Sequence, residues 1–192
     1  MNDSKIVLIG NGPSVLDHKF GRLIDSFETV VRFSWYHING HEEYVGTKTD
    51  IWFTTCADLR RMKTGGYREV YEHSWQWDPD KDKNYKNLTA YFPNAKKTKR
   101  DTIIEMQQYV DDTEYFCYST GAIAAFLFSK QYGEVTLYGF DWWESREKHH
   151  YGDNQTRGGI HKPDKEFKLF CKLAKDGRIT DLNPLSKILE IA

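Results

Sequence analysis

Two glycine-containing turns have the residue types and spacing to bind negatively charged groups. The first is Gly10-Asn11-Gly12-Pro13-Ser14, which closes a continuous apolar run over residues 5–10. The second is Ser119-Thr120-Gly121, where a strand is expected to lead into a helix. Unpaired N–H groups and the helix dipole attract an anion at such a point, and the two hydroxyls add donors. Together the turns predict seats for two separate negative groups on one ligand.

Each turn also has a simpler interpretation. Residues 10–14 imitate a dinucleotide-binding fingerprint, but Val15 stands in the place of its third glycine, so the match is incomplete. Ser119 or Thr120 can equally be an ordinary helix cap, because a side-chain oxygen there accepts a hydrogen bond from the first helical turn. The spacing alone leaves both alternatives open.

Three of the seven histidines, His149, His150 and His161, lie within thirteen residues of each other. The first two fall in a polar loop after an expected strand, at the edge where open α/β sheets bind ligands. His161 lies just before Pro163, at the start of an expected helix whose positive end should keep the imidazole neutral and able to act as a base. Glu166 can cap that helix or steady the imidazole. The alternative for each histidine is a solvated loop position.

The elements that position these residues follow from apolar runs and helical spacing. Continuous apolar runs predict strands covered on both faces, as in parallel sheets. Alternating strands and helices predict a single α/β domain over residues 1–192, Rossmann-like, with a mostly parallel sheet flanked by helices. Residues 57–112 are expected to form loops and short helices inserted between the core strands. The expected strands are 5–10, 28–33, 50–55, 114–118, 135–140 and 179–182; the expected helices are a short one from Pro13, 102–109, 121–132, and 163–176 with Phe167, Phe170, Cys171 and Ala174 on one face.

Composition excludes several classes of protein. The 192 residues carry 27 basic and 28 acidic side chains, whereas a general nucleic-acid binder would show a basic excess. No window approaches the roughly 18 consecutive apolar residues of a membrane span, and the N-terminus does not resemble a signal peptide. Cys56, Cys117 and Cys171 form no metal-ligand pattern and are expected to be buried thiols, and the acidic run at 78–82 lacks the glycine and glutamate of a calcium loop. We therefore expect a soluble, cytoplasmic protein without a metal site.

Three sets of residues, in chain order, carry a family resemblance. The first set is Gly10-Asn11, Ile24-Asp25-Ser26, Val31-Arg32-Phe33 and Gly46-Thr47-Lys48-Thr49-Asp50; the second is Ser119-Thr120-Gly121, residues 135–140 and His149-His150-Tyr151; the third is His161 with Glu166. These sets resemble the long, short and third motifs of the animal-type sialyltransferases (glycosyltransferase family 29), whose fold is a GT-A-like variant. The resemblance covers roughly two-thirds of the chain.

The resemblance implies an inverting, metal-independent glycosyltransferase without a cofactor. It would move sialic acid, or a related keto-acid sugar such as Kdo, from its CMP donor to a hydroxyl of a glycan acceptor. His150 would bond to the departing phosphate, and His161 would be the general base on the acceptor hydroxyl. The remaining donor-site residues are Asn11 and Gly12 at the phosphate and ribose, Ser119, Thr120 and Gly121 at the sugar carboxylate, Gly139 and Phe140 at the cytidine, and Ser34, Asp141 and His149.

Some residues depart from the family pattern. Ser34 stands where the family has asparagine, Asp141 where a second glycine is common, and Lys148 where an aromatic often precedes the histidine pair. These departures leave the donor sugar open and keep an alternative, a CMP-binding module of the same fold without transfer activity. A Rossmann-type oxidoreductase would rest on the incomplete glycine fingerprint alone. We expect residues 57–112 to be a variable insert that shapes the acceptor site, because the donor-binding pieces lie elsewhere.

Overall fold

The computed structural model describes residues 5–55, 65–73, 81–141, 149–150, 161–184 and 186–190, with backbone alone over 81–84. In this part of the chain, seven strands form one parallel sheet in the order β5-β4-β3-β2-β1-β6-β7. The strands are β1 (Ile6–Ile9), β2 (Thr29–Phe33), β3 (Ile51–Thr54), β4 (Glu69–Glu72), β5 (Lys96–Lys97), β6 (Val135–Tyr138) and β7 (Ile179–Asp181). The predicted α/β fold with a parallel sheet is confirmed.

The order of the strands reverses between β1 and β6. The chain builds outward from β1 through β2, β3 and β4 to β5, then returns to place β6 and β7 on the other side of β1. Ile9 therefore pairs with Tyr138, although the two residues lie far apart in the sequence. In open parallel sheets, ligands bind beyond the carboxyl ends of the strands at such a reversal. The two loops that begin at Gly10 and Gly139 meet at this position.

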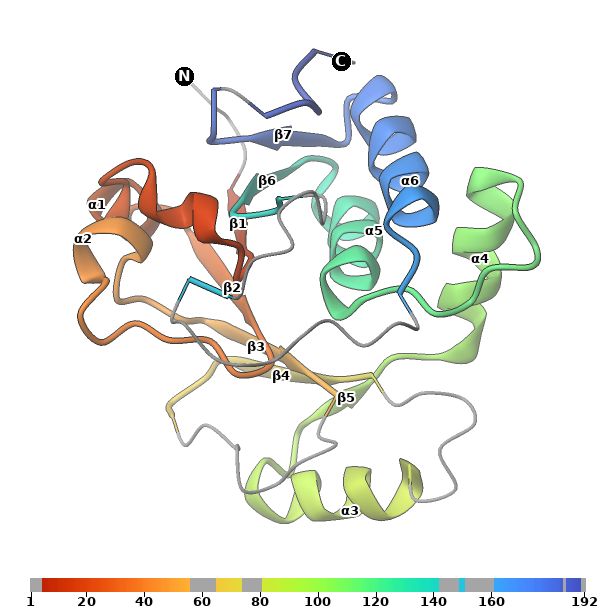
Figure 1. The fold of residues 1–192 in the computed structure, drawn as a ribbon. Coiled ribbons are helices and arrows are strands. Elements are labelled where there is room, and N and C mark those ends of the chain that lie inside the picture. Colours follow the sequence, from red (N-terminus) through yellow and green to blue (C-terminus); the bar gives the residue numbers. More distant parts are fainter. Residues whose placement is uncertain are drawn as a thin grey trace.

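Helices cover both faces of the sheet (Figure 1). They are η1 (Pro13–Leu16), a 3-10 helix, and the α-helices α1 (Gly21–Asp25), α2 (Glu42–Val45), α3 (Lys81–Tyr91), α4 (Arg100–Val110), α5 (Thr120–Tyr132) and α6 (Pro163–Lys175). Helices α4, α5 and α6 pack on the face that carries Ile6 and Leu8, and η1, α1 and α2 pack on the face that carries Val7 and Ile9. All four residues of β1 are buried, which confirms that this strand is covered on both sides.

Residues 57–112 contribute more to the sheet than the sequence predicted. Strands β4 and β5 extend the sheet in parallel beyond β3. The Tyr71 ring in β4 stacks on Phe53 with 5.5 Å between centroids and meets Phe128 of α5 edge-on. Part of this region is therefore core, and the expectation of loops and short helices alone was wrong. The predicted helix at 102–109 is confirmed as part of α4.

The predicted strand at 114–118 was also wrong. In the structure this segment is an irregular connection that leads into α5, and its backbone groups form hydrogen bonds with side chains. Gln107 Nε2 donates to the carbonyls of Thr113 and Tyr115, both at 2.9 Å. The buried Tyr115 and Tyr118 rings pack edge-on against each other at 4.7 Å. The apolar residues that suggested a strand instead contribute the buried rings of this aromatic contact.

Helix α6 is rotated slightly from its predicted orientation. Leu169, Phe170, Leu173 and Ala174 are buried, as is Glu166. Phe167 and Cys171, placed on the buried face by the sequence, are half-buried. Cys117 and Cys171 are free, half-buried thiols, and burial raises the pKa of each; Cys56 lies outside the described residues. Of the helices in the described part of the chain, none combines the length and apolarity that crossing a bilayer requires.

Candidate functional site

The first corner of the candidate site is the close approach of the loops after β1 and β6. The Gly10 N–H donates to the Tyr138 carbonyl at 2.8 Å, and the Gly12 N–H donates to the Gly139 carbonyl at 3.1 Å. A Cβ atom at Gly10 would lie 2.2 Å from the Gly139 oxygen. Gly139 itself has a φ of +76°, and its Cβ would lie 2.1 Å from Val15 Cγ1. Glycine is required here because any side chain would force the two loops apart.

A carboxylate of the chain itself fills the turn at this corner. The Ser14 N–H donates to Asp141 Oδ2 at 3.2 Å, and the Ser14 hydroxyl donates to Asp141 Oδ1. From the sequence, we expected the amides of residues 10–14 to be open to a negatively charged group of a ligand. In the structure Asp141 already accepts from Ser14, and the Gly12 amide is used within the protein. This corner is therefore not an open anion seat.

His150 joins this corner to the loop that follows β2. The His150 backbone N–H donates to the Asn11 carbonyl at 3.0 Å, and ring atom Nδ1 lies 3.3 Å from the same oxygen. Ring atom Nε2 lies 3.1 Å from the His37 carbonyl. Burial lowers the pKa of His150, and nearby His41 and His149 lower it further. Hydrogen bonding to the two carbonyls raises this pKa but does not outweigh the lowering. Bonding to a departing phosphate, the role that the sequence implied, would require one ring nitrogen to leave its carbonyl.

The loop after β2 contributes residues that the sequence analysis missed. It begins at Ser34, whose φ of +45° lies in the left-handed region that asparagine enters more readily than serine. Its carbonyl accepts from Trp52 Nε1 at 2.8 Å, which fixes the start of the loop. Beyond it, the His41 ring meets the His150 ring edge-on, with 5.3 Å between centroids. A usable signal was present, because β2 neighbours β1 and its carboxyl end faces the same edge.

The second corner is the start of α5. Ser119 caps the helix, since its Oγ accepts from the Ala122 N–H at 3.2 Å. The Ser119 N–H and hydroxyl both donate to Glu166, at 2.7 Å and 2.6 Å. Glu166 comes from the first turn of α6 and is buried, and it also accepts from the Tyr115 hydroxyl at 3.2 Å. Ordinary capping by serine, one of the open alternatives, is thus part of the structure, and an internal carboxylate lies against the same residue.

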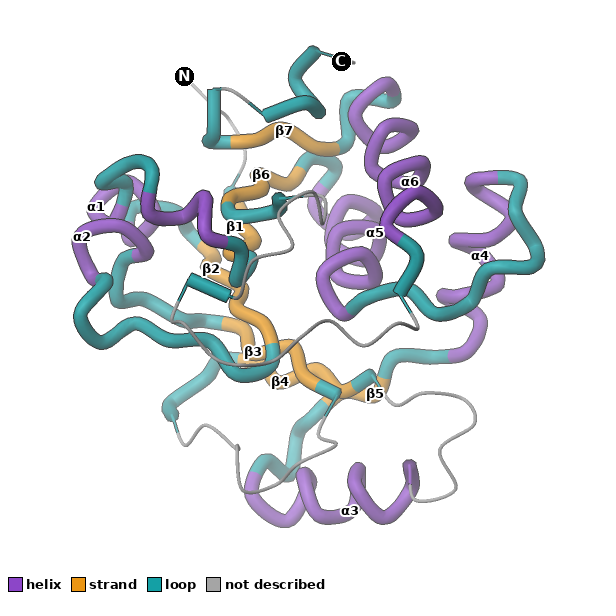
Figure 2. The backbone as a smooth tube through the Cα atoms, viewed as in Figure 1, coloured by secondary structure: helices purple, strands orange, loops and turns teal. Residues whose placement is uncertain are grey.

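His161 lies directly beside this second corner. Its Nδ1 is 2.8 Å from the Cys117 carbonyl and 3.5 Å from Glu166 Oε1. A carbonyl oxygen only accepts, so Nδ1 carries the hydrogen and the lone pair of the neutral ring lies on Nε2. Figure 2 shows the segment between α4 and α5, in teal, passing beside the loop that begins α6. This contact brings residues from two distant parts of the chain together.

The electrostatics of His161 differ from the sequence expectation. The start of α6 was expected to keep its imidazole neutral. Burial does lower the pKa of His161, but hydrogen bonding and charge from Glu166, together with the Cys117 carbonyl, outweigh burial and raise it above its ordinary value. The Glu166 carboxylate steadies the imidazole, as one sequence alternative proposed. A higher pKa makes the neutral imidazole a stronger proton acceptor.

Phe140 lies between the two corners. Its ring packs edge-on against Phe33 at 6.0 Å and against Phe170 of α6 at 5.7 Å between ring centroids. A Cβ at Gly121 would lie 2.9 Å from the same ring, so this glycine keeps the start of α5 close to β6. The structure thus gathers the described candidate residues along one edge: Asn11, Gly12, Ser34, Gly139, Asp141, His149 and His150 at the first corner, Ser119, Thr120, Gly121 and His161 at the second, and Phe140 between. Lys148 and Tyr151 lie outside the described residues.

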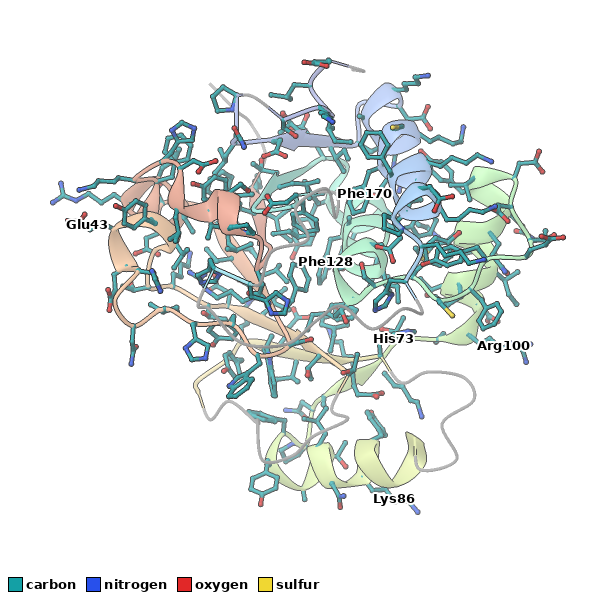
Figure 3. All side chains as sticks on the ribbon, in the orientation of Figure 1. Glu43, His73, Lys86, Arg100, Phe128 and Phe170 are labelled. Carbon is teal, nitrogen blue, oxygen red and sulfur yellow. The ribbon has the colours of Figure 1, made fainter. Side chains whose placement is uncertain are left out.

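His73 is a further histidine that the sequence analysis missed. It directly follows β4, is labelled in Figure 3, and is 4% exposed. Burial, with a smaller contribution from His161, lowers the pKa of His73 to about 4. This histidine therefore stays neutral beside His161 at physiological pH. No sequence signal pointed to it, because β4 was not predicted.

The fold is a doubly wound α/β fold in which glycine loops meet at the reversal of strand order, the place where such folds bind ligands. A family model described as glycosyltransferase family 29 (sialyltransferase) matches residues 4–116, more than half of the chain. This chain belongs to that family, as its motifs predicted. Among the described residues, no group of three His, Cys, Asp or Glu side chains is arranged to hold a metal ion.

Individual relatives agree with the family assignment. Lactosylceramide alpha-2,3-sialyltransferases from Pan troglodytes and Mus musculus are each 25% identical over 93% of this chain, and the match spans 60% and 53% of their own lengths. A crystal structure of a mammalian sialyltransferase in complex with Gal-beta-1-3GalNAc-ortho-nitrophenol is similar in fold, with a TM-score of 0.67 and 18% identity over 92% of this chain and 68% of that one. The chain thus spans little more than half the length of the curated relatives.

Proposed function

We propose that this protein transfers sialic acid, or a related keto-acid sugar such as Kdo, from its CMP donor to a hydroxyl of a glycan acceptor. The transfer inverts the anomeric carbon and needs no metal ion. His161 is the general base. The observation that carries the proposal is the contact of His161 with the Cys117 carbonyl and with Glu166, which itself bonds to Ser119 at the start of α5.

The proposed transfer is a direct displacement and needs no covalent bond between the protein and the sugar. The acceptor oxygen forms a bond to the anomeric carbon as the bond from that carbon to the phosphate oxygen breaks. The bonding electrons leave with CMP, and the acceptor proton passes to Nε2 of His161. The Nδ1 hydrogen bond and Glu166 hold the ring and stabilise the imidazolium that forms, as the third member of a catalytic triad does. General-base help of this kind contributes roughly 10²–10⁴ in rate.

The donor's carboxylate fits the start of α5 better than the turn after β1. Glu166 takes the donors of Ser119, and beyond it the first-turn amides of Thr120 and Gly121 carry the positive end of a helix of 13 residues. The buried Oδ1 of Asn11 has no hydrogen-bond partner among the described residues, so it suits a ligand hydroxyl or amino group. The donor would then span both corners across Phe140.

Two measurements test this proposal. Thermal unfolding is followed with CMP, UMP, AMP and NAD, and release of CMP is followed with CMP-Neu5Ac or CMP-Kdo and a panel of glycan acceptors. We expect stabilisation by CMP alone, and release of CMP that depends on the acceptor. Stabilisation by NAD and not by CMP would instead favour the oxidoreductase alternative. Absence of both binding and release would contradict the proposal.

The curated relatives suggest which acceptor to try first. Their names specify lactosylceramide and an alpha-2,3 linkage, so a galactose-terminated glycan is our proposed acceptor. Residues 57–112 remain our candidate for the segment that shapes the acceptor site. Exchanging residues 57–112 for the matching segment of a relative should alter acceptor preference and leave CMP binding in place; unaltered preference would refute this assignment.

A CMP-binding module without transfer activity is the second candidate. It is favoured by His150, whose ring nitrogens both face backbone carbonyls, and by Asp141, which fills the turn after β1. This candidate predicts stabilisation by CMP with no turnover of either donor. Turnover that falls on substitution of His161 would exclude it.

Cytoplasmic localisation remains a proposal, supported by the free thiols Cys117 and Cys171.

A further inference from the structure

The first corner of the site carries an acidic side chain at the turn after β1. Asp141 accepts both hydrogen bonds from Ser14, and a Cβ at Gly12 would lie 2.2 Å from its Oδ2. A second carboxyl lies close by at the end of β7. Burial raises the pKa of Asp181 to about 7, and the charge of Asp141 contributes to that rise.

The same corner has few groups left to bind an anion. The amides of Gly10, Gly12 and Val15 donate to the carbonyls of Tyr138, Gly139 and Gly12, in that order. Asn11 Oδ1, an acceptor of the same turn, has no hydrogen-bond partner among the described residues. Across the described ranges, no lysine, arginine or histidine forms an ion pair with Asp141. A phosphate placed at this turn would meet the Asp141 carboxylate, and the described amides of Gly10, Gly12 and Val15 already donate within the protein.

From this geometry we propose that Asp141 is a specificity-determining residue that restricts the site to nucleotides with one phosphate. The inference rests on the proposed function, since a CMP-sugar has a single phosphate between its nucleoside and its sugar. Doubly wound folds bind a pyrophosphate at the turn after their first strand. In this chain the Asp141 carboxylate occupies that turn and repels a second phosphate. Charge repulsion is strong where the site excludes water.

The test compares CMP and CDP by isothermal titration calorimetry. The variant Asp141→Asn keeps an oxygen acceptor for the Ser14 N–H and removes the charge. We expect the wild type to bind CMP more tightly than CDP. In Asp141→Asn, the ratio of the CDP and CMP dissociation constants should fall by about tenfold, as expected for loss of one close charge repulsion. Asp176→Asn is the matched control, because it makes the same change directly after α6, where Asp176 accepts a hydrogen bond from the Tyr109 hydroxyl.

Each outcome decides the inference. An unchanged ratio in Asp141→Asn, or an equal fall in Asp176→Asn, would overturn it and leave the proposed function intact. Wild-type protein that binds neither nucleotide would overturn the proposed function, and the inference would fall with it. Thermal unfolding without nucleotide establishes that each variant folds. If Asp141→Asn does not fold, the same ratio is measured in Asp141→Ser, with the same expectation.

Discussion

At the turn after β1, Asp141 accepts hydrogen bonds from the N–H and the hydroxyl of Ser14; at the start of α5, Glu166 accepts the same two bonds from Ser119. The neighbours of the two carboxylates differ. Glu166 lies 3.5 Å from His161 Nδ1, whereas Asp141 lies near the buried Asp181. Glu166 therefore raises the pKa of a neighbouring imidazole, whereas Asp141 raises the pKa of a second carboxyl group. In our proposals, similar local hydrogen bonding supports proton transfer at one corner and selection against a second phosphate at the other.

The largest expected effect is the loss of the base at the α5 corner. In His161→Ala, kcat for transfer from a CMP-sugar should fall by about 10²–10⁴, because no base remains to take the proton of the glycan hydroxyl. The dissociation constant for CMP, measured by calorimetry, should stay the same. Lys162→Ala is the control, since the Lys162 side chain is exposed and its backbone alone bonds to Tyr115. Equal turnover in His161→Ala would remove His161 from the mechanism.

The next effect concerns Asp181, the buried carboxyl group near Asp141 at the turn after β1. Burial raises the pKa of Asp181 to about 7 in the folded protein, so over pH 4 to 7 the folded state holds a proton that the unfolded state has released. The free energy of unfolding should therefore decrease by about 1.4 kcal/mol per pH unit in this range from this group alone. Asp181→Asn should remove that slope and be more stable than wild type at pH 8. Urea denaturation at pH 5 and pH 8 measures both, and parallel pH dependence of the two proteins would contradict it.

The smallest effect compares the glycines of the two corners. In Gly12→Ala the new Cβ would lie 2.2 Å from Asp141 and 2.8 Å from the Gly139 oxygen, so a loop or a hydrogen-bonded carboxylate must shift. In Gly121→Ala it would lie 2.9 Å from the edge of the Phe140 ring, a side chain that can turn aside. We expect Gly12→Ala to lower the free energy of unfolding by about 1 kcal/mol more than Gly121→Ala. Equal losses in urea denaturation would mean that the corners are equally adaptable.

The parts of the fold that the sequence predicted well are the ones with unmistakable local patterns. The apolar runs of β1, β2, β3 and β6 have bounds within one or two residues of those expected. Strand β4 escaped notice because two of its four residues are glutamates, and the burial of Glu72 depends on its tertiary neighbours.

The sequence predicted where the candidate site residues lie in the fold better than it predicted their hydrogen-bond partners. Family motifs placed the candidate residues, and strand order brought them to one edge. The filling of the two turns by Asp141 and Glu166 had no local signal, because Asp141 is 127 positions from Ser14 and Glu166 is 47 positions from Ser119. Whether an amide is open to a ligand depends on such distant partners. His73 was missed because β4 was not predicted, whereas His41 follows a predicted strand that neighbours β1 and could have been found.

The role of His161 as a base held by Glu166 is tested most directly by the pH dependence of kcat/KM for wild type and Glu166→Gln. Glu166 raises the pKa of His161 above its ordinary value, and the base is active when deprotonated. Wild-type activity should therefore decline as the pH falls through that raised pKa. In Glu166→Gln, which keeps an acceptor for the Ser119 N–H, this decline should move to lower pH. A decline at the same pH in both proteins, or none in either, would contradict the assignment.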